Sequence, residues 1–418
     1  MTDTLFFAAV RAHLLAGEIA LLDVREEHPF AQAHPLWAAN LPLSRIELDA
    51  WRRIPRRDTL IVVYGEHDGI DLAPLAVERL AALGYTQVRV LEGGLEGWRS
   101  AGGELFRDVN VPSKAFGELV EHERQTPSLA AEEVKALIDA KADVVVLDAR
   151  RFDEYQTMSI PTATSVPGAE LALRVRELAP DPATRVIVNC AGRTRSIIGT
   201  QSLVNAGIPN PVAALRNGTI GWKLAGQVLD HGAARRAPKA SEVNLAAART
   251  SAEDVARRAG GRWIEADALA TLEAPGRTLY RFDVRTPDEY EAGHLPGFAS
   301  APGGQLVQET DHHVPVRGAR IVLADDDGVR APMTASWLAQ MGWEVYVLAA
   351  QPASAYSERG AASAGSGSAG PAAPQIGRYR RPYEGTDAPP EAMQAYLDWE
   401  FGLVAQLESD GTHGFRVL

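Results

Sequence analysis

Three similar segments recur along this 418-residue chain, and this repetition constrains the fold more than any other feature. Each segment is an apolar run that ends in aspartate, with an arginine two residues later and an aromatic residue five further on. These positions are Asp23, Arg25 and Phe30, then Asp148, Arg150 and Tyr155, and finally Asp283, Arg285 and Tyr290. The aspartates stand 125 and 135 residues apart, so one domain is predicted in three copies.

A second set of apolar runs enters a polar loop at a constant distance from each aspartate. The first loop residue lies 42 residues downstream every time, at Gly65, Cys190 and Asp325. A helical pattern follows each loop and closes with a glycine, at Gly84, Gly207 and Gly342. Glycine directly after a helix is typical of a left-handed C-terminal cap. In the first two copies a final strand leads to a tryptophan, at Trp98 and Trp222.

Short apolar strands that alternate with helices of about 10 to 15 residues indicate βαβ units around a parallel sheet. We therefore predict an α/β protein of three tandem domains, each an open parallel sheet with helices on both faces. The functional site should lie at the carboxyl ends of the strands. The predicted domains span residues 1–108, 126–232 and 262–350. The stretches between them carry few apolar positions and are interpreted as connectors.

Beyond the third copy the composition changes. Residues 351–375 are rich in Gly, Ser, Ala and Pro and are predicted to form a flexible linker, because such a tract cannot bury a core. Residues 376–418 are predicted as a helical tail. Its apolar residues recur at helical spacing, at Met393, Leu397, Phe401, Val404 and Leu407. Pro390 and Gly411 suit the two ends of one helix of about four turns. We expect it to dock on one of the repeats or on a second copy in a homodimer.

Composition narrows the classes of function. The chain is 46% apolar and 23% charged, as in globular proteins, and no apolar run approaches the roughly 18 residues of a membrane helix. The net charge of −12 comes without a dense Lys/Arg block, so neither nucleic acid nor membrane is a predicted partner. The first residues lack the basic start of a signal peptide and predict an amphipathic helix, so we expect a cytoplasmic protein. One cysteine excludes an intrachain disulfide and any CxxC site.

That cysteine, Cys190, stands where a buried strand ends and a helix begins. The backbone N–H groups of such a loop and the N-terminus of the following helix favour an anion. Arg193 and Arg195 add two positive charges, so we expect a thiol pKa below the ordinary value of about 8.5. A buried structural cysteine is the alternative reading. Gly65 and Asp325 at the equivalent positions argue against it, because packing there does not demand a thiol.

The candidate site is therefore the loop after this middle strand. Cys190 is predicted to be the catalytic nucleophile, and the next six residues are predicted to bind substrate: Ala191, Gly192, Arg193, Thr194, Arg195 and Ser196. At least one of the two arginines should face inward, and the sequence does not choose between them. Asp148 and Arg150 recur in the copies without a cysteine, so we interpret them as supports of the loop.

These motifs, in this order, resemble the rhodanese family. The resemblance rests on the LDVR…DEY segments, HLPG at 294–297, CAGRTRS at 190–196 and NGTIGW at 217–222, and covers nearly all of residues 1–350. The tail also resembles the ending of bacterial multi-domain rhodaneses. The family implies a five-stranded parallel sheet per domain. It also implies transfer of sulfane sulfur from thiosulfate or a related donor to cyanide or a thiol, through a Cys190 persulfide and without a cofactor.

The donor itself stays open. Two-domain thiosulfate enzymes of that family carry an arginine just before the aromatic residue of the first motif, where this chain has Glu154. Thiosulfate, 3-mercaptopyruvate, a low-molecular-weight persulfide and a protein persulfide are all candidates. Repeats one and three lack the thiol, so we expect them to shape access to the middle site or to recruit an acceptor.

Other classes of function fit less well. Cysteine phosphatases of this fold use a longer loop with an arginine six residues after the cysteine, where this chain has Ser196. A partner-recruiting scaffold with little turnover would suit the outer repeats but not the intact middle loop. His67, His312 and His313 are interpreted as solvated side chains, because no third ligand is spaced around them, and no metal is predicted.

Overall fold

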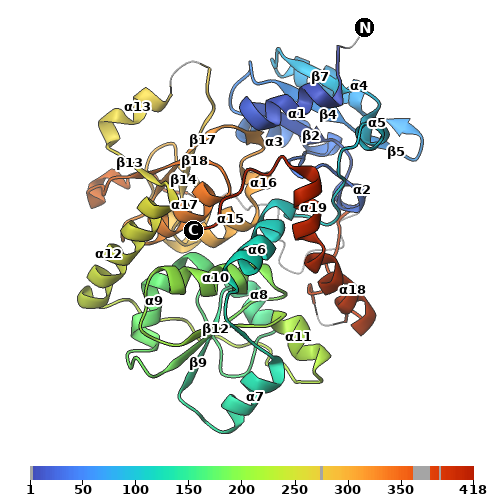
Figure 1. Cartoon of the computed structure of the whole chain (residues 1–418). Helices are drawn as coiled ribbons and strands as arrows, with labels where there is room; N and C mark the ends of the chain where they lie inside the picture. The colour runs from blue at the N-terminus through green and yellow to red at the C-terminus, as the bar shows by residue number, and fades with distance from the viewer. Residues whose placement is uncertain (1–2, 274–275, 361–376, 386) are drawn as a thin grey trace.

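Each repeat forms its own five-stranded parallel sheet with helices on both faces, which confirms the predicted fold class (Figure 1). The computed structural model describes residues 3–273, 276–360, 377–385 and 387–418. In repeat one the order is β1 (Thr4–Leu5), β7 (Val88–Leu91), β4 (Ile61–Tyr64), β2 (Ile19–Asp23) and β3 (Ala39–Asn40). In repeat two it is β10 (Thr164–Ser165), β9 (Val144–Asp148), β11 (Arg185–Asn189), β12 (Val212–Leu215) and β8 (Ser128–Leu129). In repeat three it is β15 (Ala299–Ser300), β14 (Leu279–Asp283), β17 (Arg320–Ala324), β18 (Glu344–Leu348) and β13 (Arg262–Ile264).

Among the described residues, each repeat also contains five α-helices. Repeat one contains α1 (Phe7–Ala16), α2 (Glu27–Gln32), α3 (Ile46–Arg53), α4 (Ala73–Ala82) and α5 (Gly94–Ser100). Repeat two contains α7 (Ala131–Asp139), α8 (Phe152–Thr157), α9 (Leu171–Leu178), α10 (Thr194–Asn205) and α11 (Gly218–Leu224). Repeat three contains α13 (Leu269–Leu272), α14 (Pro287–Ala292), α15 (Gly303–Gln308), α16 (Thr310–His313) and α17 (Arg330–Gln340). Short 3₁₀ helices occupy Leu43–Arg45, Gly168–Glu170, Ala266–Ala268 and Ala353–Ala355.

Glycines end the helix that follows each loop, as predicted. Gly84, Gly207 and Gly342 have φ values of +89°, +64° and +82°. Only glycine adopts this left-handed conformation at little cost, so each helix stops at the same place and the chain turns back into the sheet.

The first connector is not a simple link. It forms α6 (Val111–Arg124), which lies at the centre of the molecule (Figure 1). Val111, Ala115, Phe116 and Val120 are fully buried, because four apolar residues at helical spacing make one apolar face. Gly117 lets the helix approach repeat two, since a Cβ there would lie 2.9 Å from Thr194 Cγ2. The connector does carry few apolar residues, but because they share one face it forms a buried helix instead of a simple link.

The second connector contains α12 (Glu242–Ala259), a helix of 18 residues. Its buried residues are small, at Ala248, Ala252, Val255 and Ala256, and they pack against α9 of repeat two and α17 of repeat three. The connector therefore ties the second and third repeats together.

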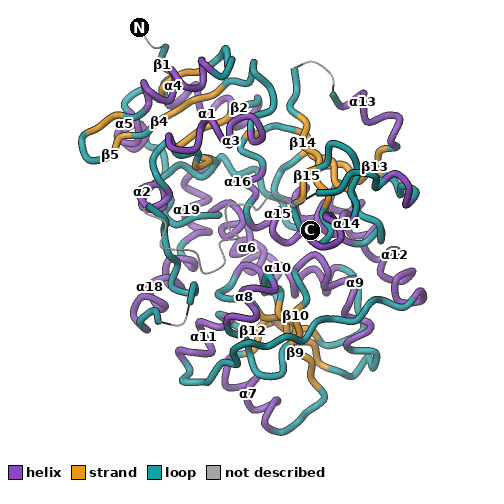
Figure 2. The backbone as a smooth tube through the Cα atoms, turned by 180° about the vertical axis from the view of Figure 1, so that it is seen from behind, coloured by secondary structure: helices purple, strands orange, loops and turns teal. Residues whose placement is uncertain are grey.

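The tail forms two helices instead of the predicted one. These are α18 (Pro390–Phe401) and α19 (Leu403–Asp410), with a break at Gly402, and Gly411 ends the second with φ +61°. The tail docks within the same chain: α19 packs on α6, and α18 packs on α6 and α11 (Figures 1 and 2). Of the predicted linker, residues 361–375 lie outside the described residues. The predicted homodimer stays a prediction.

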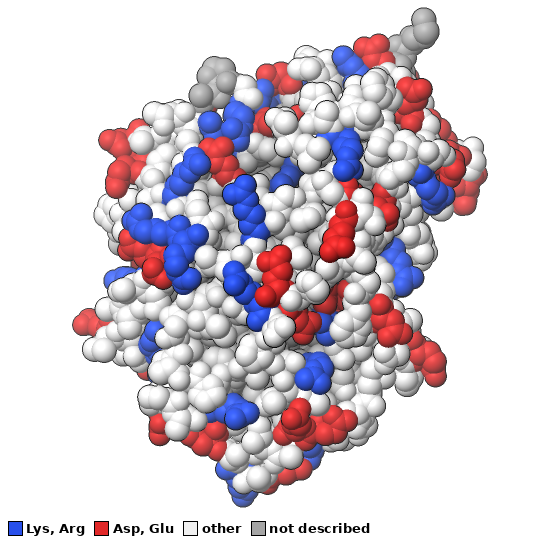
Figure 3. Space-filling model, in the orientation of Figure 1, with Lys and Arg blue, Asp and Glu red and all other residues white. Residues whose placement is uncertain are grey.

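Repeat three also extends the sheet of repeat one. Strand β16 (Val316–Arg317) pairs antiparallel with β2, with Val316 opposite Ala20. Repeat one additionally carries a small hairpin of β5 (Glu66–His67) and β6 (Ile70–Asp71). Within the described part of the chain, no helix has the length and apolar character needed to cross a membrane. Acidic and basic side chains are interspersed on the face shown in Figure 3.

Candidate active site

The loop from Cys190 to Arg193 leaves the end of β11 and enters α10. The register of β9 with β11 places Asp148 beside Asn189, directly before the cysteine. The N-terminus of α11 holds the loop from the other side, because Thr219 N donates to Cys190 O at 2.9 Å and Ile220 N donates to Ala191 O at 3.0 Å. The NGTIGW motif therefore fixes the backbone of the loop.

The Cys190 thiol is buried, with 2% of the residue exposed. Its Sγ lies 3.3 Å from Ser196 Oγ, and that hydroxyl donates to Arg193 O at 2.8 Å. Burial raises the pKa of this thiol above its ordinary value, and the Arg195 charge and hydrogen bonds from Ser196 oppose the shift. The expectation of a lowered pKa was wrong for this structure, because burial outweighs the loop's positive groups.

Arg193 does not face the sulfur. Its guanidinium binds Glu118 of α6, with Nε 2.7 Å from Oε1, and also contacts Glu121 and Asn217. Phe401 of the tail lies 4.0 Å beneath the guanidinium carbon. Arg193 thus ties the loop to α6 and the tail.

Arg195 is the arginine whose charge acts on Cys190. It also forms a two-bond ion pair with Glu154 of α8, at 2.7 and 2.8 Å. This pair holds the pKa of Glu154 well below its usual range despite the burial of the carboxyl. Glu154, which departs from the two-domain pattern, therefore serves as the anchor of Arg195.

Asp148 and Arg150 form a buried pair beneath the loop. Arg150 donates to Asp148 at 2.9 and 2.7 Å and to Met158 O at 2.5 Å, and Asn189 Nδ2 donates to Asp148 Oδ2 at 3.0 Å. The equivalent pairs in repeats one and three bind the carbonyls of Ala33 and Gly293, eight residues after each arginine. Recurrence in all repeats is consistent with a supporting role, which stays a prediction.

A small cavity of about 20 Å³ lies over the cysteine, with room for about one water molecule. The predicted loop supplies one side of it. The other side comes from segments outside repeat two, with residues of α6, of repeat three and of the tail: Ser113, Lys114, Gln308, Tyr383, Tyr396 and Glu400. These six residues stand outside the repeated motifs, and no spacing in the sequence links them to Cys190, so the sequence does not predict them.

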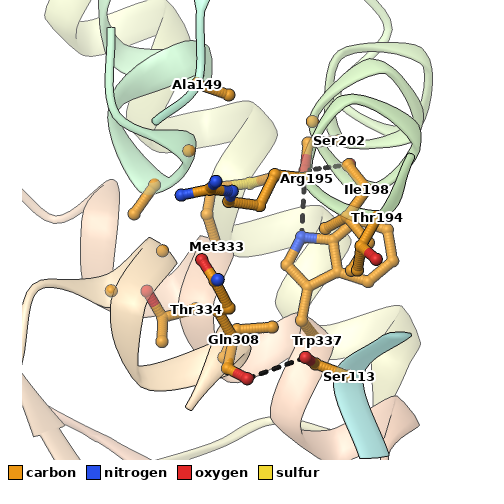
Figure 4. Close-up of a pocket in the computed structure, with 16 residues that line it drawn as sticks. Ser113, Ala149, Thr194, Arg195, Ile198, Ser202, Gln308, Met333, Thr334 and Trp337 are labelled. Atoms are coloured by element: carbon orange, nitrogen blue, oxygen red, sulfur yellow. Dashed lines mark hydrogen bonds between the residues drawn. The ribbon is translucent and has the colours of Figure 1, made fainter. Parts of the chain in front are cut away.

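A second, mostly apolar cavity of about 40 Å³ lies between repeats two and three (Figure 4). Arg195 of the loop borders it, opposite Trp337 of α17. Trp337 Nε1 donates to Ser202 Oγ at 2.9 Å, and Ser113 Oγ donates to Gln308 O at 2.7 Å. The Cys190 loop and the start of α10 therefore lie at the interface with repeat three.

The loop of repeat three that is equivalent to the Cys190 loop shows which backbone N–H groups point into such a loop. Asp325 holds the cysteine position, and its carboxylate accepts from Gly328 N at 3.0 Å and Ala331 N at 2.8 Å. The corresponding groups in repeat two are the N–H groups of Arg193 and Ser196. In repeat three a side-chain carboxylate thus occupies the anion position of the loop. In repeat two the backbone of Ser196 favours the anionic form of Cys190.

The histidines behave differently from the prediction in two of three cases. His67 is exposed, as expected, but His312 and His313 are half-buried in α16. Burial lowers the pKa of both, that of His313 to about 4. Within residues 3–273, 276–360, 377–385 and 387–418, no group of three or more His, Cys, Asp or Glu side chains is placed to hold a metal ion.

Comparisons with known proteins agree with this geometry. The family model described as "Rhodanese-like domain" matches residues 7–101, 130–225 and 266–350. A crystal structure of thiosulfate sulfurtransferase from Pseudomonas aeruginosa is 54% identical, with a TM-score of 0.95 and 100% of each chain covered. The Alr3790 protein from Anabaena sp. is 28% identical over 26% of this chain and 84% of its own, with a TM-score of 0.23.

One curated relative is the HTH-type transcriptional regulator Rv0324 from Mycobacterium tuberculosis, 33% identical over 91 residues, or 22% of this chain. The chain spans about two fifths of that relative's length, 39%.

The domain limits given above stay a prediction. Because the family model matches more than half of the chain, in three copies around the three sheets described, this protein belongs to the rhodanese family.

Proposed function

We propose that this protein moves sulfane sulfur from a thiosulfate-like donor to a thiophilic acceptor through a persulfide on Cys190. It is a sulfurtransferase by its membership of the family and its full-length similarity to the Pseudomonas enzyme. The observation that carries the persulfide is the position of the sole thiol of the chain. It lies at the carboxyl end of the central strand β11, at the N-terminus of α10.

In the donor half-reaction, the Cys190 thiolate attacks the outer sulfur of thiosulfate. The sulfur–sulfur bond of the donor breaks, its electron pair leaves with sulfite, and the outer sulfur stays on Cys190. The cavity of about 20 Å³ suits one added sulfur atom, since it holds about one water molecule. Ser196 and Arg195 favour the anionic sulfur before and after the transfer.

In the acceptor half-reaction, cyanide or a thiol removes the outer sulfur. The chain has no second cysteine that could do so, and therefore the persulfide waits for an external acceptor. Kinetics should be ping-pong, with sulfite released before the acceptor binds.

A phosphatase is disfavoured by the loop, because Arg195 stands five residues after the cysteine and is bound to Glu154. A scaffold role without turnover suits the loop of repeat three, where a carboxylate replaces the thiol. The scaffold alternative does not account for the buried thiol beside Ser196.

The decisive experiment is intact mass spectrometry after exposure to donor alone. The wild type should gain about 32 Da, one sulfur atom, on Cys190 and lose it to cyanide, whereas Cys190→Ser should gain nothing. Thiosulfate and 3-mercaptopyruvate are compared as donors, each with cyanide and with glutathione. Intersecting double-reciprocal plots together with an unmodified Cys190 would exclude the persulfide route.

A further inference from the structure

The cations around the cavity are already neutralised. Among the described residues, the three that line it are each paired with a carboxylate at 2.7 Å, in Arg193–Glu118, Arg195–Glu154 and Lys114–Asp108. Sulfite leaves thiosulfate with an extra electron pair, and charge that develops in a buried site needs a positive group or a proton donor. Paired cations stabilise this charge less than free ones do, so the departure of sulfite from this site needs a proton donor.

Glu400 of α18 is placed to supply one. The residue is 1% exposed, and its Oε1 accepts a hydrogen bond from Tyr396 at 2.9 Å. Its Oε2 is buried and has no hydrogen-bond partner among the residues that the structure describes. That oxygen lies 3.3 Å from where a Cβ on Gly192 would be, so it is directed at the loop. A buried polar atom left without a partner is rare, and here it borders the cavity of Cys190.

The surroundings of Glu400 keep it protonated. Burial and the neighbouring Glu118 raise its pKa to about 8, against the opposing effects of Lys114, Tyr396 and Arg193. The charges of Glu400 and Cys190 also repel each other. At neutral pH the side chain is therefore a carboxylic acid whose free oxygen can donate.

A bound thiosulfate is too large to lie within the cavity over Cys190 without contacting its walls. The cavity has room for about one water molecule, and thiosulfate brings a sulfonate in addition to its outer sulfur. With the outer sulfur against Cys190, the sulfonate meets the side chains across the cavity, among them Lys114, Tyr396 and Glu400.

We propose that Glu400 is a catalytic acid of the donor half-reaction, a role that rests on the function proposed above. Its Oε2–H bonds to a sulfonate oxygen of the bound thiosulfate. As the Cys190 thiolate takes the outer sulfur and the donor's sulfur–sulfur bond breaks, the proton passes to the departing sulfite. The products are the Cys190 persulfide anion, hydrogen sulfite and the Glu400 carboxylate, which regains its proton from water.

The test compares Glu400→Gln with Glu391→Gln in the full-length protein. Glu391 lies on the same helix but is exposed, so it controls for a Glu-to-Gln substitution in α18 away from the cavity. Persulfide formation from thiosulfate is followed in single turnovers by rapid quench and intact mass, and its discharge by thiocyanate release. Glu400→Gln should slow the donor half-reaction by about 100-fold and leave the cyanide half-reaction unchanged, because acid catalysis contributes roughly 10²–10⁴-fold. Glu391→Gln should match the wild type.

The pH profile gives a second readout that a merely structural role would not produce. In the wild type the donor half-reaction should rise with the Cys190 thiolate, level off above about pH 8 as the acid ionises, and fall once the thiol, whose pKa burial raises, is fully ionised; Glu400→Gln should keep rising above pH 8 without a falling limb. A wild-type rate that keeps rising through pH 8 without levelling off overturns the proposal, even if the variant fails to fold. So does a folded Glu400→Gln with the wild-type rate. A wild type that gains no sulfur from thiosulfate instead refutes the proposed function, and this role with it.

Discussion

Gly218→Ala should damage the catalytic loop, and the chain contains its own control. Gly218 begins α11 with φ +53°, and a Cβ there would lie 2.3 Å from Cys190 O and 2.8 Å from the carbonyl carbons of Cys190 and Ala191. Gly94 begins α5 of repeat one with φ +54°, and a Cβ there meets no atom of the described residues within 4 Å. Both substitutions force alanine into the left-handed region, but only the first collides with backbone.

The magnitudes follow from these distances. The left-handed conformation costs alanine about 1–2 kcal/mol in either variant. To restore ordinary contact, the Cys190 and Ala191 carbonyls must move by up to about 1 Å, which breaks or bends their bonds from Thr219 and Ile220 at about 1 kcal/mol each. Gly218→Ala should therefore cost about 3–4 kcal/mol and Gly94→Ala about 1–2 kcal/mol. A nucleophile misplaced by about 1 Å should also lose roughly 100-fold in rate.

Guanidinium unfolding, followed by tryptophan fluorescence, measures the first effect, and single-turnover persulfide formation measures the second. Gly94→Ala should form the persulfide at the wild-type rate. Equal destabilisation in the two variants, or a wild-type rate in Gly218→Ala, would refute the idea that α11 fixes the loop.

Further predictions concern charge. Arg195→Met should raise the apparent pKa of the thiol, measured by the pH dependence of iodoacetamide alkylation, and should raise the KM for thiosulfate. Arg330→Met, its counterpart in repeat three, should lower stability alone. Equal KM values in the two variants would contradict this prediction. Burial lowers the pKa of His312 and His313, so both take up protons on unfolding below pH 6.5. Stability measured by urea unfolding should therefore fall as the pH drops from about 6.5 towards 4. A stability that does not change over this range would contradict the prediction. Glu400 keeps its proton up to about pH 8 in the folded protein, whereas in the unfolded chain it loses the proton near pH 4.5. The folded wild-type protein therefore loses stability as the pH rises from 4.5 to about 8, and Glu400→Gln should become more stable relative to the wild type over that range.

The repeated parts of the chain could be predicted because each position has a local cause. The aspartate and arginine of the first motif form the same ion pair and bind the same carbonyl position in all three repeats. The capping glycines Gly84, Gly207 and Gly342 all have positive φ. Such features depend on residues close in sequence or on one spacing copied three times, so the pattern alone predicts them.

The far side of the cavity depends on packing between distant segments. Lys114 belongs to a connector, Gln308 to repeat three and Glu400 to the tail, and nothing in the sequence relates their positions to Cys190. The direction of the thiol pKa could not be predicted for the same reason. It depends on how deeply these segments bury the sulfur and on which carboxylates pair with its arginines.

The comparison of repeats two and three separates what supports the loop from what makes it reactive. Arg195 with Glu154 and Arg330 with Glu289 occupy equivalent positions, and both pairs are formed, although repeat three has no thiol. An ion pair that persists without the nucleophile is a feature of the fold, so its charge is largely committed to its partner. What repeat two has in addition is the thiol and, across the cavity, the carboxyl of Glu400. If Glu400 acts as proposed, the reactivity of the site depends on the tail as well as on the repeat that carries the cysteine.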